Sequence, residues 1–257
     1  MTRRFERVEN SVEIYRFPAL DALGFRTFVT GRGGGVSAPP FDSLNVDPGG
    51  GDDPANIEEN LRRIKEALSL EILWTPRQVH GDGIAVIDSG GGGEPPPADI
   101  EADAVVVSSP GIAIGVKTAD CLPILMADPE RKVAAAVHAG RRGSELYIAR
   151  RAAETMVKRF GCEPGAITAA LGPCVRECCY EVDVASARRF RACCGGSGSR
   201  MVDLVGANVR QLLDAGLLEE NIIDSGVCVS CESGRFFSHR KDRGRTGRFV
   251  SGLAVRT

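Results

Sequence analysis

Two short apolar runs separated by a polar turn constrain the fold of this chain more than any other feature. The runs cover residues 122–127 and 133–137, and the sequence Asp-Pro-Glu-Arg-Lys stands between them. Each run is too short for an ordinary helix and the turn is rich in helix breakers, so the pattern predicts two neighbouring buried strands. Cys121 opens the first strand and His138 closes the second. If the strands pair as a hairpin, the thiol and the imidazole lie within reach of each other.

A thiol beside an imidazole is either a nucleophile with its base or a pair of ligands for one metal ion. The chain has three histidines, so a site that needs several must use nearly all of them. His80 stands next to a glycine at the edge of a predicted strand at 84–87. Two imidazoles and a thiolate suit zinc, and three protein ligands leave a fourth position open, as in catalytic sites. We therefore predict a zinc site at His80, Cys121 and His138; the alternative is a buried cysteine beside two structural histidines.

Two aspartates are candidates to orient a ligand histidine or to move protons. Asp120 directly precedes Cys121, and Asp103 lies within a predicted strand at 102–107. Together with Cys121 and His138, they are the candidate catalytic residues.

A glycine-rich segment follows a predicted strand at 23–30. Its sequence is Gly-Arg-Gly-Gly-Gly at residues 31–35. Such a loop lets backbone N–H groups approach an anion, and Arg32 can add a bidentate contact to phosphate. The alternative is a plain flexible turn, because the segment lacks the GK[ST] ending of a P-loop and the spacing of a dinucleotide fingerprint.

The chain has nine cysteines, an odd number in a chain that is not a small secreted one. This composition favours free thiols or metal binding over disulfides. The pair Cys228 and Cys231, in CxxC spacing, can join Cys174 or Cys178 in a second, structural zinc site. We expect the adjacent cysteines to be small buried residues: Cys178 with Cys179, and Cys193 with Cys194.

Predicted helices and strands alternate along the chain without a composition break. Four helices are expected. Their N-caps are Asp53, Ser144, Asp183 and Asp203, and they end at about residues 68, 160, 194 and 215, respectively. Further strands are expected at 111–116, 166–171, 222–223 and the C-terminal end. The segment 90–98 is interpreted as a flexible loop inserted between strands. The pattern predicts one mixed α/β domain over residues 1–257.

Charge and hydropathy exclude some classes of partner. The net charge of −2 gives no general attraction to nucleic acid or anionic membranes. We find neither an apolar run near 18 residues nor a signal peptide, so we expect a cytoplasmic protein without membrane partners. The expected assembly is a monomer or a weak homo-oligomer.

Four groups of motifs resemble, in the same order, those of the YfiH-like family, also called laccase-domain, multicopper polyphenol oxidase or peptidoglycan editing factor proteins. They span about residues 25 to 250. The motifs are Arg-Gly-Gly-Gly-Val-Ser at 32–37 with Ser-Leu-Asn at 43–45, Gln-Val-His-Gly at 78–81, Thr-Ala-Asp-Cys-Leu-Pro at 118–123 with His-Ala-Gly-x-Arg-Gly at 138–143, and Phe-Phe-Ser-His-Arg at 236–240 with Thr-Gly-Arg at 246–248.

The resemblance implies an α-β-β-α fold, in which mixed β-sheets are sandwiched between helices. It also implies one zinc ion on the residues that match His80, Cys121 and His138. Members of the family are associated with phosphorolysis of adenosine, inosine, guanosine and methylthioadenosine, and with adenosine deaminase activity. On this basis the candidate residues for binding nucleoside or phosphate are Arg32, Asn45, Gln78, Arg240 and Arg248.

Two positions differ from the family pattern. Arg141 stands where the family usually has Trp, and Val229 stands where it tends to have Thr. The first change affects the packing or a stacking surface near the predicted site.

Three histidines are too few for a blue-copper site together with a trinuclear copper site, so we predict no laccase activity. Two other functions compete with the phosphorylase. One is a metal-free cysteine hydrolase or amidase, with Cys121 as nucleophile and His138 as base, that edits peptidoglycan precursors. The other is a non-catalytic, metal-dependent partner protein.

Overall fold

The predicted hairpin lies at the centre of the structure. In the computed structural model, which describes residues 5–8, 11–88, 97, 99–196 and 198–256, β8 (Leu122–Asp128) pairs antiparallel with β9 (Val133–Ala139). Leu122 stands opposite Ala139, and Pro123 stands opposite His138. This register brings Cys121 and His138 to the same end of the hairpin, as the sequence predicts.

The described strands form two mixed sheets. The first has the order β1 (Glu6–Val8), β2 (Ile14–Arg16), β3 (Phe25–Thr30), β12 (Phe249–Val255), β7 (Ile112–Thr118) and β4 (Ile72–Trp74). The second has the order β11 (Ile222–Asp224), β10 (Thr168–Leu171), β8, β9, β6 (Ala104–Val107) and β5 (Ile84–Ile87). The pairs β4–β7, β5–β6 and β10–β11 are parallel and the others antiparallel.

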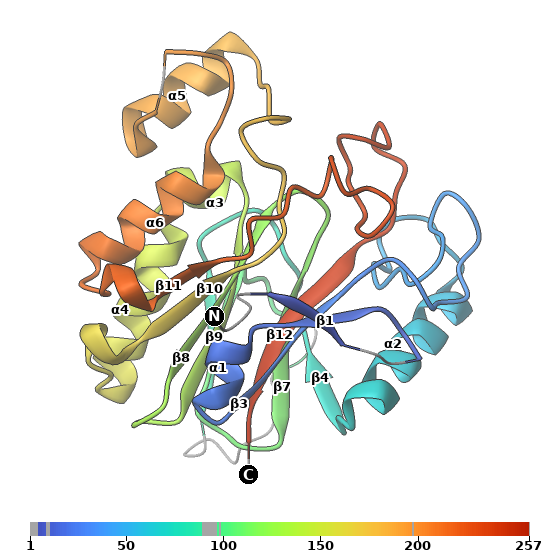
Figure 1. Ribbon diagram of the computed structural model, residues 1–257, viewed down its shortest axis with the longest axis horizontal. Helices are drawn as coiled ribbons and strands as arrows, with labels where there is room; N and C mark the ends of the chain where they lie inside the picture. The colour runs from blue at the N-terminus through green and yellow to red at the C-terminus, as the bar shows by residue number, and fades with distance from the viewer. Residues whose placement is uncertain (1–4, 9–10, 89–96, 98, 197, 257) are drawn as a thin grey trace.

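The two sheets pack face to face, with helices on both outer sides (Figure 1). Side chains alternate along β8, so Leu125 and Ala127 enter the core between the sheets while Ile124 and Met126 face the helices. Both faces of the strand are therefore buried, which explains its continuous apolar sequence. This arrangement confirms the predicted α-β-β-α fold.

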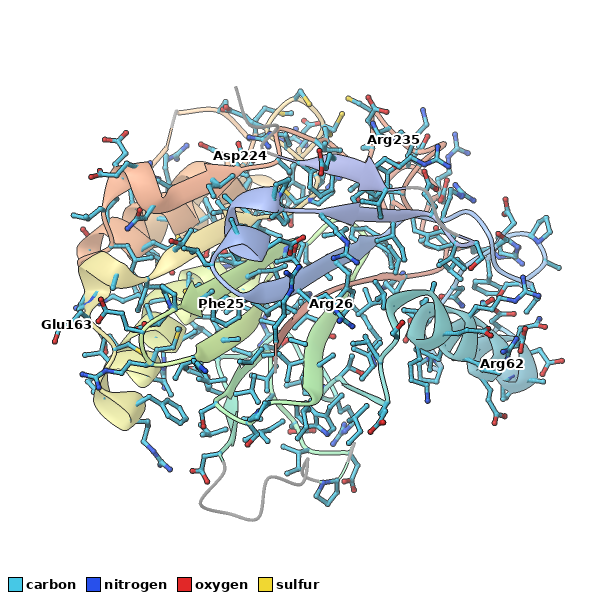
Figure 2. The ribbon with its side chains drawn as sticks, turned by 60° about the horizontal axis from the view of Figure 1, so that its bottom comes forward. Phe25, Arg26, Arg62, Glu163, Asp224 and Arg235 are labelled. Carbon is cyan, nitrogen blue, oxygen red and sulfur yellow. The ribbon has the colours of Figure 1, made fainter. Side chains whose placement is uncertain are left out.

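One helix covers the outer face of the first sheet. α2 (Pro54–Leu68) is capped by the Asp53 carboxylate, which accepts a hydrogen bond from Ala55 N at 2.9 Å. Ile64 and Leu68 pack on the sheet, whereas Arg62 points outward (Figure 2). The short helix α1 (Pro18–Ala22) leads into β3.

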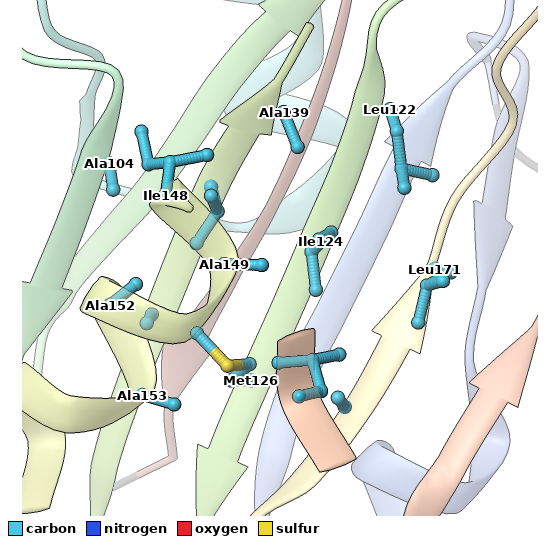
Figure 3. Close-up of a cluster of buried hydrophobic side chains, with 14 of the residues drawn as sticks. Ala104, Leu122, Ile124, Met126, Ala139, Ile148, Ala149, Ala152, Ala153 and Leu171 are labelled. Carbon is cyan, nitrogen blue, oxygen red and sulfur yellow. The ribbon is translucent and has the colours of Figure 1, made fainter. Parts of the chain in front are cut away.

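Helices α3 (Arg141–Glu145), α4 (Ile148–Phe160), α5 (Val184–Cys194) and α6 (Leu204–Asp214) lie on the side of the second sheet. Figure 3 shows Ala149 and Ala152 of α4 against Ile124 and Met126 of β8. The small alanine side chains let the helix approach the sheet closely. Asp183 and Asp203 cap α5 and α6 as predicted.

The prediction of one helix capped by Ser144 and running to Phe160 was wrong. Tyr147 adopts left-handed φ and ψ angles of 61° and 34° and divides the segment into α3 and α4. Ser144 lies inside α3, where its hydroxyl accepts a hydrogen bond from Asn208 and its carbonyl accepts one from Gln211, both on α6. Tertiary hydrogen bonds therefore decide the course of the chain here.

The predicted loop at 90–98 lies outside the described residues except for Pro97. Among the helices that the structure describes, none combines the length and the apolar character needed to cross a membrane.

Candidate metal centre and cavity

The end of the β8–β9 hairpin that carries Cys121 and His138 opens into a cavity of about 930 Å³. The candidate ligands His80, Cys121 and His138 line it, together with Asp120. Basic side chains dominate the rest of its described wall: Arg77, Lys117, Arg141, Arg142, Arg240, Arg243 and Arg248.

The three residues predicted as metal ligands are brought together from three separate segments. His80 lies in the loop before β5, Cys121 just before β8, and His138 near the end of β9. Their ligand atoms all lie within 4.8 Å of one another, and the two imidazole centroids are 4.8 Å apart. Two imidazoles and one thiol at these separations fit a single ion with an open coordination position.

Asp103, fully buried just before β6, organises two of these ligands. Its Oδ1 accepts hydrogen bonds from His138 Nδ1 at 2.8 Å and from His80 N at 2.9 Å. Its Oδ2 accepts from Val79 N at 3.2 Å and from Gly81 N at 2.7 Å. The contact to Nδ1 leaves Nε2 of His138 as the candidate ligand atom, a carboxylate–histidine arrangement common around zinc. Asp103 does not line the cavity.

Without a metal ion, these contacts strongly shift the pKa values of Cys121 and His138. Burial acts to raise the pKa of Cys121, but the charge and hydrogen bonds of His138 and His80 outweigh it and lower the pKa to about 6. Burial acts to lower the pKa of His138, but Cys121 and Asp103 raise it to about 9. A thiolate beside an imidazolium therefore forms at neutral pH, with Asp103 supporting the cation.

The backbone is unusual at two of these positions. His80 has φ of 58° and Asp120 has φ of 112°, in the region that side-chain-bearing residues rarely adopt. The hydrogen bonds to Asp103 hold the loop around His80. The carboxylate of Asp120 accepts from Ser238 Oγ at 2.6 Å and from Arg240 N at 2.7 Å, which fixes its own loop and the 238–240 segment. Such strained conformations concentrate at functional sites.

Gly140 leaves room for the sulfur of Cys121. A Cβ atom at position 140 would lie 2.8 Å from Cys121 Sγ and 3.4 Å from His80 Cδ2. Glycine is therefore required by close approach, because any larger residue would displace the thiol.

Three of the five residues predicted to bind nucleoside or phosphate line the cavity. Gln78 exchanges two 2.8 Å hydrogen bonds with the backbone of Lys117, so it ties the His80 loop to β7. Arg240 lies over the ring of Tyr180, with 5.2 Å from the guanidinium carbon to the centroid. Arg248 has its Nε 4.0 Å from Asp47 Oδ2.

The structure does not bring Arg32 or Asn45 to the described wall of the cavity. Arg32 donates to the carbonyls of Asp42 and Ser233, and its guanidinium lies over Phe237. Asn45 is buried, and its Oδ1 accepts from Asp47 N and Arg248 N. Asn45 therefore positions two residues of the cavity wall, whereas Arg32 joins segments outside the described wall.

The glycine-rich loop uses its backbone donors internally. Gly31 N donates to the carbonyl of Glu13, and Gly33 N donates to the Glu13 carboxylate. Gly35 N donates to Ser43 Oγ at 3.0 Å. These donors pack the loop against its neighbours instead of pointing at the cavity.

Two residues of the cavity wall, Lys117 and Tyr180, were not predicted as site residues, and Arg141 was noted only as a departure from the family pattern. Lys117 is a single basic residue in the apolar strand β7, which is the signal that it faces a site; burial lowers its pKa, although Asp47 opposes that effect. Tyr180 directly follows the adjacent pair Cys178 and Cys179 and lines the cavity. Arg141 forms an ion pair with Glu145 at 2.6 Å and faces the cavity, where the family usually has Trp.

A second group of potential ligands lies outside this cavity. The sulfur atoms of Cys178, Cys179, Cys228 and Cys231 all lie within 4.8 Å of one another. The expectation that Cys178 and Cys179 are buried was wrong, because Cys178 is exposed and Cys179 half-buried. In the other adjacent pair, Cys193 is exposed and Cys194 buried.

Comparisons with known proteins agree with the motifs. The family model for the multi-copper polyphenol oxidoreductase laccase matches residues 26–256. A purine nucleoside phosphorylase of Mycobacterium tuberculosis is 39% identical over 240 residues, which cover 90% of this chain and 92% of the relative. One of Deinococcus radiodurans is 40% identical over 237 residues, 88% of each chain. The crystal structure of YlmD from Geobacillus stearothermophilus has a TM-score of 0.90 and 31% identity, and the match covers 99% of this chain and 100% of that one.

Proposed function

The chain belongs to the multi-copper polyphenol oxidoreductase laccase family, and from its cavity and its relatives we propose that it is a zinc-dependent purine nucleoside phosphorylase. The proposed substrates are adenosine, inosine, guanosine and methylthioadenosine. With phosphate the first three would give the free base and ribose 1-phosphate, and methylthioadenosine would give adenine and methylthioribose 1-phosphate.

The observation that carries the proposal is that one cavity contains both a candidate metal group and a strongly basic wall. Phosphorolysis needs a site for phosphate and a site for the nucleoside in contact with each other. A volume of about 930 Å³ is within the range of small-molecule sites and accommodates both. The relatives named purine nucleoside phosphorylases cover almost the whole chain, which supports the same assignment.

Phosphate would bind to the basic part of the wall. Lys117, Arg240 and Arg248 come from separate segments and face one cavity. Asp47 and Asp120 are the acidic residues on the described wall. The excess of positive charge favours a dianion, and guanidinium groups can hold phosphate through paired hydrogen bonds.

The purine would lie against Tyr180. Its ring is half-buried in the cavity wall, and Arg240 covers part of it. Aromatic and guanidinium faces are suited to stacking on a flat heterocycle. Arg141 would border this pocket in place of the family's usual Trp, so we infer a more polar rim.

The candidate metal group fits zinc by its donors and by the space that Gly140 leaves. His80, Cys121 and His138 would hold the ion, and zinc would supply a Lewis acid at one end of the cavity. Asp103 would keep His138 in the ligating tautomer. A blue-copper centre would use both histidines and the cysteine; among the chain's three histidines only His239 would remain, so we infer no multicopper oxidase activity.

We also propose that the protein deaminates adenosine. It would use the same cavity, with the purine turned so that its C6 faces the metal group. The site residues assigned here to catalysis are Asp103, Asp120, Cys121 and His138, with both aspartates in positioning roles because both oxygens of each accept hydrogen bonds.

The test is turnover of each nucleoside by the zinc-loaded protein, with and without phosphate, and separation of the products by chromatography. Inosine should release hypoxanthine only when phosphate is present, whereas adenosine should give adenine by phosphorolysis and inosine by deamination. Cys121→Ala, purified in parallel, controls for contaminating host enzymes and should abolish release. Failure of the zinc-loaded protein to release a base from any of the four nucleosides would overturn the phosphorylase assignment.

A second candidate function is favoured by one observation. Cys121, His138 and Asp103 form a thiol–imidazole–carboxylate chain of the kind that activates cysteine nucleophiles. In this role the protein would be a metal-free amidase acting on peptidoglycan precursors. Covalent trapping of Cys121 by an electrophile, in protein that remains active after zinc removal, would favour this candidate over the phosphorylase.

A further inference from the structure

The four-cysteine group joins two loops that leave the edge of the second sheet. Cys178 and Cys179 lie in the loop after β10, and Cys228 and Cys231 lie in the loop after β11. The parallel pairing of β10 with β11 continues beyond the strands, where Cys174 N donates to the carbonyl of Val227 and Val229 N donates to that of Cys174. Asp224 and Arg235, which flank the second loop, are labelled in Figure 2.

The sulfur atoms of Cys178, Cys179 and Cys231 form a triangle, and the sulfur of Cys228 lies within 4.8 Å of each of them. Three of their separations are 3.8 Å for Cys178–Cys179, 3.9 Å for Cys178–Cys231 and 3.6 Å for Cys179–Cys231. A tetrahedral zinc ion with bonds of about 2.3 Å requires sulfur–sulfur separations of about 3.8 Å. A disulfide would instead require about 2.05 Å.

We propose that Cys178, Cys179, Cys228 and Cys231 bind a second zinc ion in a closed, structural site. Four thiolates leave no open position, which separates this site from the three-ligand group in the cavity. Each thiol would lose its proton to solvent as the metal binds. The sequence suggested Cys174 or Cys178 as partners of the CxxC pair; the geometry selects Cys178 with Cys179, and Cys174 contributes backbone pairing.

The surroundings of Cys228 suit a thiolate ligand. Backbone N–H groups of Arg176, Ser230 and Cys231 donate hydrogen bonds to its sulfur. Ser230 and Cys231 follow Cys228 by two and three residues, so the CxxC turn itself donates hydrogen bonds to the Cys228 sulfur. Cys178 and Cys231 are exposed, which gives the metal a route of entry.

The site would fix part of the cavity wall. Tyr180 directly follows Cys179, and the loop of Cys231 leads into the 238–240 segment, where Arg240 lies over Tyr180. Arg176 of the first loop adds an ion pair with Asp224, the last residue of β11, at 2.6 Å. Zinc would therefore link the segments that supply the two sides of the proposed purine pocket.

The first test measures zinc per chain by mass spectrometry of the eluted metal in the native protein and its variants. Cys231→Ser should lose one zinc, His80→Ala should lose the other, and the double variant should lose both. Cys193→Ser, which changes an exposed cysteine outside both groups, should match the native protein. His80→Ala measures the loss of zinc from the cavity group alone. The two zinc sites are therefore tested separately, and neither result depends on enzyme activity.

A second test needs no substitution and so does not depend on how the variants fold. Cysteines of the native protein are alkylated with and without a zinc chelator, and the modified peptides are identified. All four cysteines should be protected with zinc and react after its removal, while Cys193 should react in both states. The proposal is overturned if Cys231→Ser retains the zinc content of the native protein, or if the unreduced protein contains a disulfide between the two loops.

Discussion

At the scale of single residues, Asp103 connects the fold to the candidate metal centre. It carries four hydrogen bonds from the His80 loop and from His138, and it is fully buried. Burial acts to raise its pKa, but the contacts with His138, Gly81 and Val79 outweigh this effect and hold the pKa below its usual range. The carboxylate therefore stays charged at neutral pH and orients two ligands at once.

Asp103→Asn should weaken zinc binding at the cavity group by about 10–100-fold, because an amide cannot accept all four hydrogen bonds. Competition with a chromophoric chelator measures the affinity. Asp128→Asn is the matched control, because Asp128 is equally buried but accepts hydrogen bonds in the β8–β9 turn. Equal zinc affinities in the two variants would show that Asp103 has no role in orienting the ligands.

Cys121 provides a pH-dependent readout in the metal-free protein. Its pKa of about 6 means that the thiolate is abundant at pH 7 and is lost as the pH falls through about 6. Alkylation of the Cys121 peptide should therefore slow around pH 6, not around 8.5 as for an ordinary cysteine, and zinc should protect it. Cys162, which is buried and whose pKa burial raises to about 12, should remain unmodified. An inflection near 8.5 for Cys121 would contradict the assigned ion pair with His138.

At the scale of elements, the junction between β9 and α3 sets the space around the candidate metal group. Gly140 is the N-cap of α3, and its Cα faces the sulfur of Cys121. Gly140→Ala should reduce zinc affinity by on the order of tenfold or more while the protein stays folded, because ligands must be held within about 0.5 Å of their working geometry. Gly165→Ala is the control, since its nearest neighbour, Leu218, would lie at an ordinary 3.8 Å. Retained affinity with an unchanged circular dichroism spectrum would show that Cys121 can move without loss of the site.

The hairpin and the proximity of His80, Cys121 and His138 could be predicted because their signals can be read from the sequence. Apolar runs in the sequence indicate buried strands. Because the chain has three histidines, few combinations of residues could form a site with several histidine ligands. The helix caps at Asp53, Asp183 and Asp203 were predicted for the same reason, since a cap depends on residues within one turn.

Features that depend on distant contacts could not be predicted. The break at Tyr147 follows from hydrogen bonds between Ser144 and α6, which no local pattern records. Arg32 looked like a phosphate ligand because nothing near it in sequence reveals that Ser233 and Phe237 cover it. Cys178 was a predicted partner of the CxxC turn, but the choice of Cys179 over Cys174 as its companion depends on the parallel register of β10 and β11.

At the scale of the whole molecule, the core between the sheets joins both halves of the structure. Leu125 from the second sheet and Trp74 from the first belong to the same buried cluster. The candidate metal group lies where the chain crosses from one sheet to the other, with His80 between β4 and β5 and Cys121 between β7 and β8. The two sheets should therefore unfold together, because neither can expose its inner face while the other remains folded.

Leu125→Ala tests this coupling. Removing a fully buried leucine should destabilise the protein by about 2–5 kcal/mol, and the loss should affect both sheets. Trp74 is the only tryptophan, so its fluorescence reports on the first sheet, whereas far-ultraviolet circular dichroism reports on the whole chain. In urea, both signals should shift to the same lower midpoint. Leu213→Ala, at a side chain 38% exposed on α6, should change the free energy of unfolding from either signal by no more than about 0.5 kcal/mol. If the Trp74 transition keeps its native midpoint in Leu125→Ala while the circular dichroism moves, the sheets are separate cooperative units and the metal group spans a boundary between them.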